Sequence, residues 1–231
     1  MRLFGRDDDG VLRILGLPAG LRGLTSSEVR LRCFEPENPR LLVPRTTGLG
    51  WDLNLGAVAV RLGLIRPDDS LPDLVDHIPG STVRMLVAVP PVMTAGTCAL
   101  AAAVGRRADR LPSGWDATFR PRGWGRPRAA LGPLVGVSTV LAGWSLWQNR
   151  LEDRGVDVMA TAEILGVQAG MAVLVVAAGR GARRPEARSW SAALAPVAVV
   201  TVATGVCVAV VRTALDHVAT ELATRPGPTR R

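Results

Sequence analysis

The sequence predicts a membrane all-α bundle of four transmembrane helices, preceded by a small soluble α+β domain. The 231-residue chain has 48% hydrophobic residues and a mean hydropathy of +0.22, which is high for a soluble protein with only 4% aromatics. Its apolar residues gather in four runs of a length that crosses a bilayer core of about 30 Å. These runs cover residues 85–104, 129–147, 158–178 and 191–211.

Residues 1–80 are expected to form the soluble domain. Val29, Leu31 and Cys33 alternate with arginines, which predicts a strand with one face inward. A domain this small buries a thin core, so we expect support from the membrane or a partner. Its other expected elements are a turn at 7–10, strands at 41–43 and 51–55 paired as a hairpin, and short helices at 57–64 and 71–78.

The most specific motif in the chain is NPRLLVPRTTGLGWDLNLG, residues 38–56. It has an Asn-Pro-Arg start, an apolar stretch, Val-Pro-Arg, Gly-Leu-Gly-Trp and an Asn-containing strand end. In this order it resembles the domain-of-unknown-function family 5808, which occurs in bacterial, especially actinobacterial, proteins that often carry membrane helices. The resemblance covers residues 34–69 and departs from the pattern at Asp52 and Leu55. It implies no activity, so it transfers no functional residue.

The motif has two interpretations. As a scaffold, the glycines of 48–50 adopt positive φ, Trp51 anchors the core, and the Asn54 amide bonds to backbone at a strand end. The alternative is a recognition loop in which Arg40, Arg45 and Asn54, beside Trp51, hold an anionic or peptide ligand. The residue types favour the scaffold.

The net charge of +8 is concentrated in two loops between the apolar runs. Residues 1–84 are neutral overall, whereas the loop 105–128 carries +5 and the loop 179–190 carries +3. Arginines beside membrane spans set topology and attract anionic lipid headgroups, so no nucleic-acid partner is expected. Counted near short loops, they favour a cytoplasmic side for both loops, and four spans then put the amino-terminal domain outside a multi-pass cell-membrane protein. The alternative is a cytoplasmic amino-terminal domain, because an arginine-rich domain without a signal peptide is awkward to translocate. Both arginine-rich loops would then lie outside unless the first span fails to cross.

No catalytic, cofactor or metal site is predicted. Cys33, Cys98 and Cys207 have no paired spacing, and His77 and His217 accompany no nucleophile pattern. We therefore expect no enzyme, no cofactor and no disulfide framework.

Small residues recur along the apolar runs at intervals of three and four, and such stripes allow membrane helices to approach closely. We expect them to form the internal seams of the bundle, and a homodimer through one of them is an open alternative. The glycines of these stripes are Gly132, Gly136 and Gly143, then Gly166 and Gly170, and finally Gly205.

Glu163 is the one carboxylate inside an apolar run. At about 100° per residue it should share a face with Gly166 and Gly170. It is expected to be either a membrane-end carboxylate paired with Arg154 or, less favoured, an ion or proton site. Residues Pro90-Pro91 should kink the first span or open its backbone hydrogen bonds.

The expected role is non-enzymatic, in interaction or signalling with an unidentified protein partner in the cell envelope. The alternative is a small transporter or channel subunit that uses Glu163 and the Pro90-Pro91 kink. Residues 212–231 are expected to form a short amphipathic or flexible tail.

Overall fold

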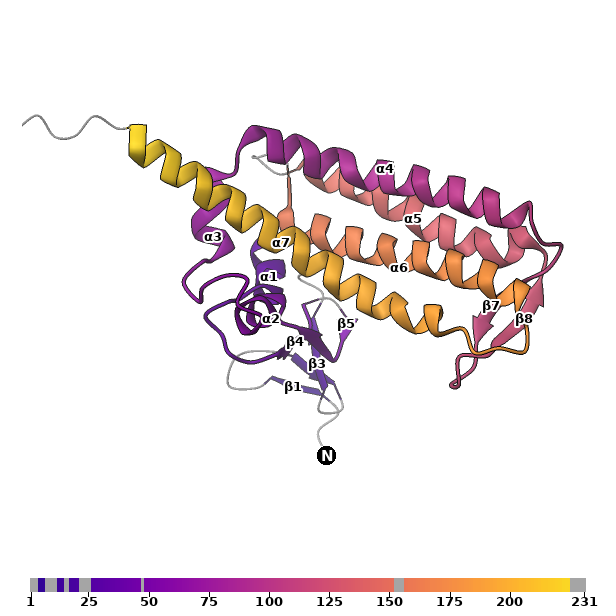
Figure 1. Ribbon diagram of the computed structural model, residues 1–231. Coiled ribbons are helices and arrows are strands. Elements are labelled where there is room, and N and C mark those ends of the chain that lie inside the picture. The colour runs from indigo at the N-terminus through magenta and orange to yellow at the C-terminus, as the bar shows by residue number, and fades with distance from the viewer. Residues whose placement is uncertain are drawn as a thin grey trace, which may run out of the picture. The chain divides into compact units, whose positions relative to one another are not determined.

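The computed structural model describes residues 4–6, 12–14, 17–20, 26–46, 48–151 and 156–224 (Figure 1). The chain divides into two compact units. One comprises Met1–Val83, Val158–Ala160 and Thr204–Arg231, and the other comprises Arg84–Asp157 and Thr161–Ala203. The turn predicted at 7–10 lies outside the described residues.

The first unit contains a four-stranded antiparallel sheet and a separate hairpin. The sheet order is β1 (Phe4–Arg6), β2 (Leu12–Ile14), β3 (Leu17–Gly20) and β5 (Gly48–Leu49). The hairpin pairs β4 (Leu42–Pro44) with β6 (Trp51–Leu53), which confirms the predicted pairing. Between its strands Gly48 and Gly50 have φ of 98° and 104°, as the glycine pattern predicts.

The strand predicted over residues 29–33 is wrong. The segment forms α1 (Ser27–Arg30) and a 3₁₀ helix, η2 (Leu31–Cys33). Ser26 caps α1, since its side chain accepts a hydrogen bond from Val29 N at 3.3 Å. Arg30 and Cys33 are the buried positions, at the helical spacing of three. The segment is therefore helical, although its apolar residues alternate with arginines as they would in a strand.

The two short helices of this unit are confirmed with shifted ends. The first is α2 (Leu55–Arg61), and the second is α3 (Leu71–Leu74) continued by a 3₁₀ turn, η3 (Val75–His77). Gly56 in α2 is required by close approach, because a Cβ there would lie 2.6 Å from Pro36 N.

Trp51 does not anchor the core as the motif suggested, because the residue is 46% exposed. The register pairs Val43 with Asp52, and Val43 is buried. Alternation along β6 turns Trp51 away from that face. The core is built instead around the fully buried side chains of Phe34, Leu71 and Ala59.

Four long helices follow, and each is long and apolar enough to span a membrane. Their ends extend beyond the predicted apolar runs because polar and charged residues continue each helix. They are α4 (Gly80–Gly105), α5 (Pro127–Asn149), α6 (Val158–Arg183) and α7 (Trp190–Thr224). Helix α4 is continuous through Pro90-Pro91.

Helix α7 has 35 residues and continues from the fourth apolar run into the predicted tail as far as Thr224, so the tail is helical there but is not a separate element. No proline or glycine interrupts residues 212–224, and the helix therefore continues. Its last part belongs to the first unit and contacts the domain there. The Arg212 guanidinium donates to the Leu64 carbonyl at 2.9 and 3.2 Å, and Glu221 lies 3.7 Å from His77.

The loop between α4 and α5 contains an unpredicted hairpin of β7 (Leu111–Trp115) and β8 (Pro121–Gly125). In Figure 1 it lies at the end of the helices where α4 stops and α5 starts. Leu111 is fully buried in a cluster with Leu131 of α5 and Val175 of α6. Apolar packing therefore holds the first arginine-rich loop against the bundle.

The small-residue seam is confirmed only between α6 and α7. A Cβ on Gly166 would lie 2.6 Å from Val199 O, and one on Gly170 would lie 2.9 Å from Val199 Cγ2. These two glycines allow the backbones to approach closely.

The other predicted seams are not internal. A Cβ on Gly132, Gly136, Gly143 or Gly205 would meet no described atom within 4 Å. In α5 the inward positions are occupied instead by small polar and apolar side chains. These are Ser138, Ala142 and Ser145, which are buried at the same helical spacing.

We expect Gly166→Ala to destabilise the bundle, because the methyl group cannot fit against the Val199 carbonyl without moving a helix. The overpacking should cost about 1 to 3 kcal/mol. The matched control is Gly136→Ala, which enters open space and should leave stability unchanged. Thermal unfolding of both variants in one detergent measures the difference, and equal stability of the two would contradict the seam.

Candidate functional site

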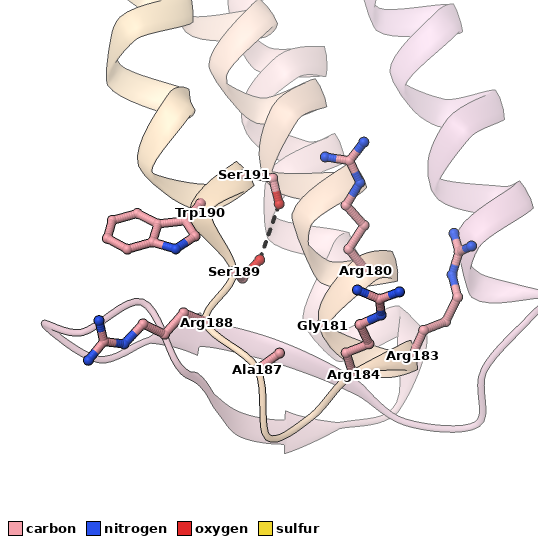
Figure 2. Close-up of a pocket in the computed structure, with 9 residues that line it drawn as sticks. All are labelled: Arg180, Gly181, Arg183, Arg184, Ala187, Arg188, Ser189, Trp190 and Ser191. Carbon is pink, nitrogen blue, oxygen red and sulfur yellow. Dashed lines mark hydrogen bonds between the residues drawn. The ribbon is translucent and has the colours of Figure 1, made fainter.

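The strongest candidate site is an arginine-rich pocket of about 490 Å³ in the second unit, where α6 ends and α7 begins (Figure 2). We call it the arginine pocket. It is lined by Arg180, Gly181, Arg183, Arg184, Ala187, Arg188, Ser189, Trp190 and Ser191.

The pocket is held by the β7–β8 hairpin. A Cβ on Gly181 would lie 3.1 Å from ring atoms of Pro112 and Pro121, so the end of α6 packs closely on both strands. The Ser189 N–H donates to the Phe119 carbonyl at 2.7 Å, and the Phe119 and Trp190 rings lie 5.6 Å apart. The start of α7 is thereby fixed to the tip of the hairpin.

The tip is in turn organised by Asp116. Its carboxylate accepts hydrogen bonds from the Thr118 hydroxyl at 2.7 Å and from the Thr118 and Arg120 N–H groups at 2.8 and 3.0 Å. These bonds, first that of the Thr118 hydroxyl and then that of the Arg120 N–H, lower the pKa of Asp116. The turn is therefore stabilised by the ionised carboxylate, and this contribution is lost only as pH falls through the lowered pKa.

All charged side chains that line the pocket are positive. In Figure 2 the side chains of Arg180 and Arg184 rise beside Ser189 and Ser191, whose hydroxyl oxygens are 3.2 Å apart. Among the described residues, none of the four lining arginines forms an ion pair. Guanidinium groups donate hydrogen bonds in a planar fork that fits carboxylate and phosphate oxygens, so the arrangement can hold an anion.

The family motif centres on Asn54, which is fully buried. Its side-chain oxygen accepts from Glu35 N at 3.0 Å and from Ala57 N at 3.2 Å, where it caps α2. Its amide nitrogen donates to the carbonyls of Glu35, Asn38 and Arg40 at 2.9 to 3.2 Å. One side chain thus joins the loop before β4 to the start of α2.

Residues 36–61 match the model of DUF5808, a family of unknown function. The DUF5808 segment therefore covers the loop before β4, the hairpin and the whole of α2, and Asn54 joins these parts. No curated protein and no solved structure matches the chain.

The proposed binding residues of the DUF5808 segment are not gathered in a cavity. The Arg45 side chain pairs with Asp52 at 3.0 Å, which explains the Asp at a position where the motif departs from the family pattern. The Arg40 side chain is exposed, and Trp51 is half exposed. A second pocket, of about 800 Å³, includes the start of the segment, and we call it the acidic pocket because three glutamates line it against one arginine, Arg32. The glutamates are Glu28, Glu35 and Glu37. None of the proposed binding residues Arg40, Arg45, Trp51 and Asn54 lines it.

The placement predicted for Glu163 is wrong. Glu163 is exposed, whereas Gly166 and Gly170 are buried against α7. Exposure contradicts only a position in the seam, and the favoured membrane-end carboxylate stays a prediction. Arg154, its proposed partner, lies outside the described residues.

The buried polar centre of the second unit is Gln168, which was not among the predicted site residues. Its amide nitrogen lies 3.1 Å from Pro90 O, 2.9 Å from Thr94 Oγ1 and 3.1 Å from Ser138 O. The Thr94 hydroxyl also donates to Ser138 O at 3.0 Å. This cluster, the Gln168 node, joins α4, α5 and α6 at mid-length. A sequence feature that could have predicted this cluster is the uncharged polar residue near the middle of each of three apolar runs, namely Thr94, Ser138 and Gln168.

We expect Asn54→Ala to open the DUF5808 segment, because five hydrogen bonds disappear and buried backbone groups lose their partners. The loss should be about 3 kcal/mol or more. Hydrogen exchange of residues 36–61 in the full-length protein in detergent measures it. Asn38→Ala removes a more exposed amide from the same segment and should change exchange much less. Equal effects would contradict the central role of Asn54.

We expect Gln168→Leu to weaken the bundle by about 0.6 to 2 kcal/mol, the range typical of hydrogen bonds between membrane helices. The control is Thr97→Val, because Thr97 is buried but bonds only within α4, to Met93 O. Resistance of the two variants to unfolding by denaturing detergent compares them. A Gln168→Leu protein no weaker than the control would show that the node does not hold the helices together.

Proposed function

We propose that the protein is a non-enzymatic integral membrane protein of the cell envelope that works by interaction with anionic groups at the membrane surface. The observation that carries this proposal is the arginine pocket, which lies where two helices long enough to span a membrane meet. Helices of this length bring their ends to the two headgroup layers of a bilayer. The pocket would then lie among phospholipid headgroups.

The chemistry of the pocket favours binding over catalysis. Its lining consists of guanidinium groups, serine hydroxyls, small residues and one indole. Guanidinium groups remain protonated at all working pH values, so they bind anions well and transfer protons poorly.

A contact between the two arginine-rich loops supports a position of both loops on the same side of the membrane. The β7–β8 hairpin and the start of α7 are joined by the bond from Ser189 N to Phe119 O. By the charge rule for short loops, this side is the cytoplasm. Four crossings then return the chain to its starting side, in keeping with the contact between Arg212 and Leu64.

A protein partner is proposed for the first unit, where the acidic pocket beside the DUF5808 segment offers three glutamates. A homodimer through the glycine stripe of α5, which has no described neighbour, remains a prediction. The transport alternative has less support, because Glu163 is exposed and Pro90-Pro91 lie within a continuous helix.

Labelling of introduced cysteines tests the proposed topology. In a variant without Cys33, Cys98 and Cys207, a cysteine is placed at Ala117 or at Ala187, both exposed. A membrane-impermeant thiol reagent should label neither in intact cells and both in inverted membrane vesicles. Labelling of either position in intact cells would contradict the cytoplasmic placement, and labelling of the two from opposite sides would contradict the shared surface.

A further inference from the structure

We propose that the arginine pocket is a specific site for the phosphate group of an anionic phospholipid, with the acyl chains lying along α7. The proposal rests on the proposed membrane location and deepens it, because it names one class of ligand and one site. Three independent features of the pocket carry it, namely its charge, its rigid support and the apolar surface that leads away from it.

The charge of the pocket lacks a partner in the described part of the chain. Its four arginines make no ion pair there, and Arg183 Nε has only a long contact of 3.4 Å to Gly179 O. Residues 180–188 carry these four arginines against the single carboxylate of Glu186, and a local excess of positive charge attracts an anion. A phosphate group offers several oxygens to the planar forks of two or more arginines at once.

The pocket is fixed before any ligand arrives. Helix α7 begins at Trp190, and Ser189, Trp190 and Ser191 line the pocket, so the positive end of the helix dipole lies beside it and favours a negative charge. The Ser189 and Ser191 hydroxyl groups share one hydrogen bond of 3.2 Å, which leaves one of their two protons for a further acceptor. Because the hairpin holds both the end of α6 and the start of α7, the backbone needs no ordering when the ligand binds.

The adjoining surface of α7 favours a lipid over free phosphate. Trp190, Leu194 and Val197 are 61%, 55% and 56% exposed, and their spacing of four and three places them on one face. This stripe starts at the mouth of the pocket and runs along the helix. It provides an apolar surface for acyl chains directly below a site for the phosphate, with a tryptophan at the level where membrane proteins favour one.

Native mass spectrometry of the full-length protein released from nanodiscs tests the site. The discs contain phosphatidylcholine with a minor fraction of phosphatidylglycerol. The wild-type protein should retain phosphatidylglycerol, and Arg180→Gln/Arg184→Gln should weaken this retention about tenfold or more, because two charge-assisted contacts are lost. The matched control is Arg106→Gln/Arg107→Gln, which removes the same charge from exposed positions outside the pocket and should change retention less than about twofold.

Equal weakening by the two double variants would overturn the proposal in favour of diffuse surface charge, as would retention unchanged by either. Thermal unfolding of both double variants shows whether either one is less stable than the wild-type protein. A further variant, Arg180→Lys/Arg184→Lys, keeps the charge and should restore part of the lipid retention. A parallel titration of the detergent-solubilised protein with inorganic phosphate separates the sources of the anion. Binding of phosphate with no preference for phosphatidylglycerol would replace the lipid by a soluble ligand.

The same experiment separates this proposal from the one on which it rests. If the protein fails to enter nanodiscs at all, the membrane location fails. If it enters them and shows no pocket-dependent lipid, only the specific site fails.

Discussion

Under the proposed membrane location, the second unit depends on one constraint, which is that a helix in a hydrocarbon environment must satisfy its polar groups and find its packing contacts within the protein. The Gln168 node meets half of the first part, since its amide nitrogen lies within hydrogen-bonding distance of oxygens from α4 and α5, whereas its buried Oε1 has no partner among the described residues. The close approach of α6 and α7 at Gly166 meets the second. Helix α6 therefore has neighbours on two sides, and 56% of its most apolar window is buried, the largest share among the four long helices. This central position makes α6 the helix against which the others are placed.

The placement of α6 also explains the arginine pocket. Once α6 is fixed by its neighbours, its last turn carries Arg180 and Arg183 beyond the apolar stretch, and Arg184 follows directly after the helix. The β7–β8 hairpin packs on Gly181 and binds the backbone at Ser189, so the connection to α7 is short and ordered. The charge of the loop 179–190 alone would suggest only a topology signal, but in the structure this loop lines a pocket. The pocket thus follows from the packing of the bundle and from the hairpin together.

The sequence was sufficient for features that depend on length and local chemistry. Four apolar runs gave four long helices, and the glycines at 48 and 50 gave positive φ in a hairpin. The sequence was insufficient where tertiary contacts choose between two allowed patterns. Residues 29–33 alternate like a strand but form helical turns, because Ser26 caps them and the spacing of the buried residues suits a helix.

Angular position on a helix was likewise predictable, but not which sector a neighbour would cover. Glu163 lies close in angle to Gly166 and is nevertheless exposed. The glycines of α5 form a stripe of the correct spacing, yet Ser138 and Ala142 occupy the inward face. The hairpin that shapes the arginine pocket was also missed, because its short strands contain proline, glycine and arginine instead of a strand-like apolar pattern.

The DUF5808 segment illustrates a different relation between sequence and structure. Its most informative residue, Asn54, is buried and bonds only to backbone in the described structure, so a strong sequence pattern here encodes a fold. The exposed residues around it, and the acidic pocket beside it, are the surfaces left for recognition.

The central claim is that the arginine pocket lies in the headgroup layer at the end of membrane-spanning helices. Spin labels attached to single cysteines at Leu194 and at Ala187, in the purified protein in nanodiscs, test it most directly. The label at position 194 should be accessible to oxygen and protected from a water-soluble nickel chelate, whereas the label at 187 should show the reverse. Access of the nickel chelate to both positions would contradict the account, because the exposed stripe of α7 would then face water.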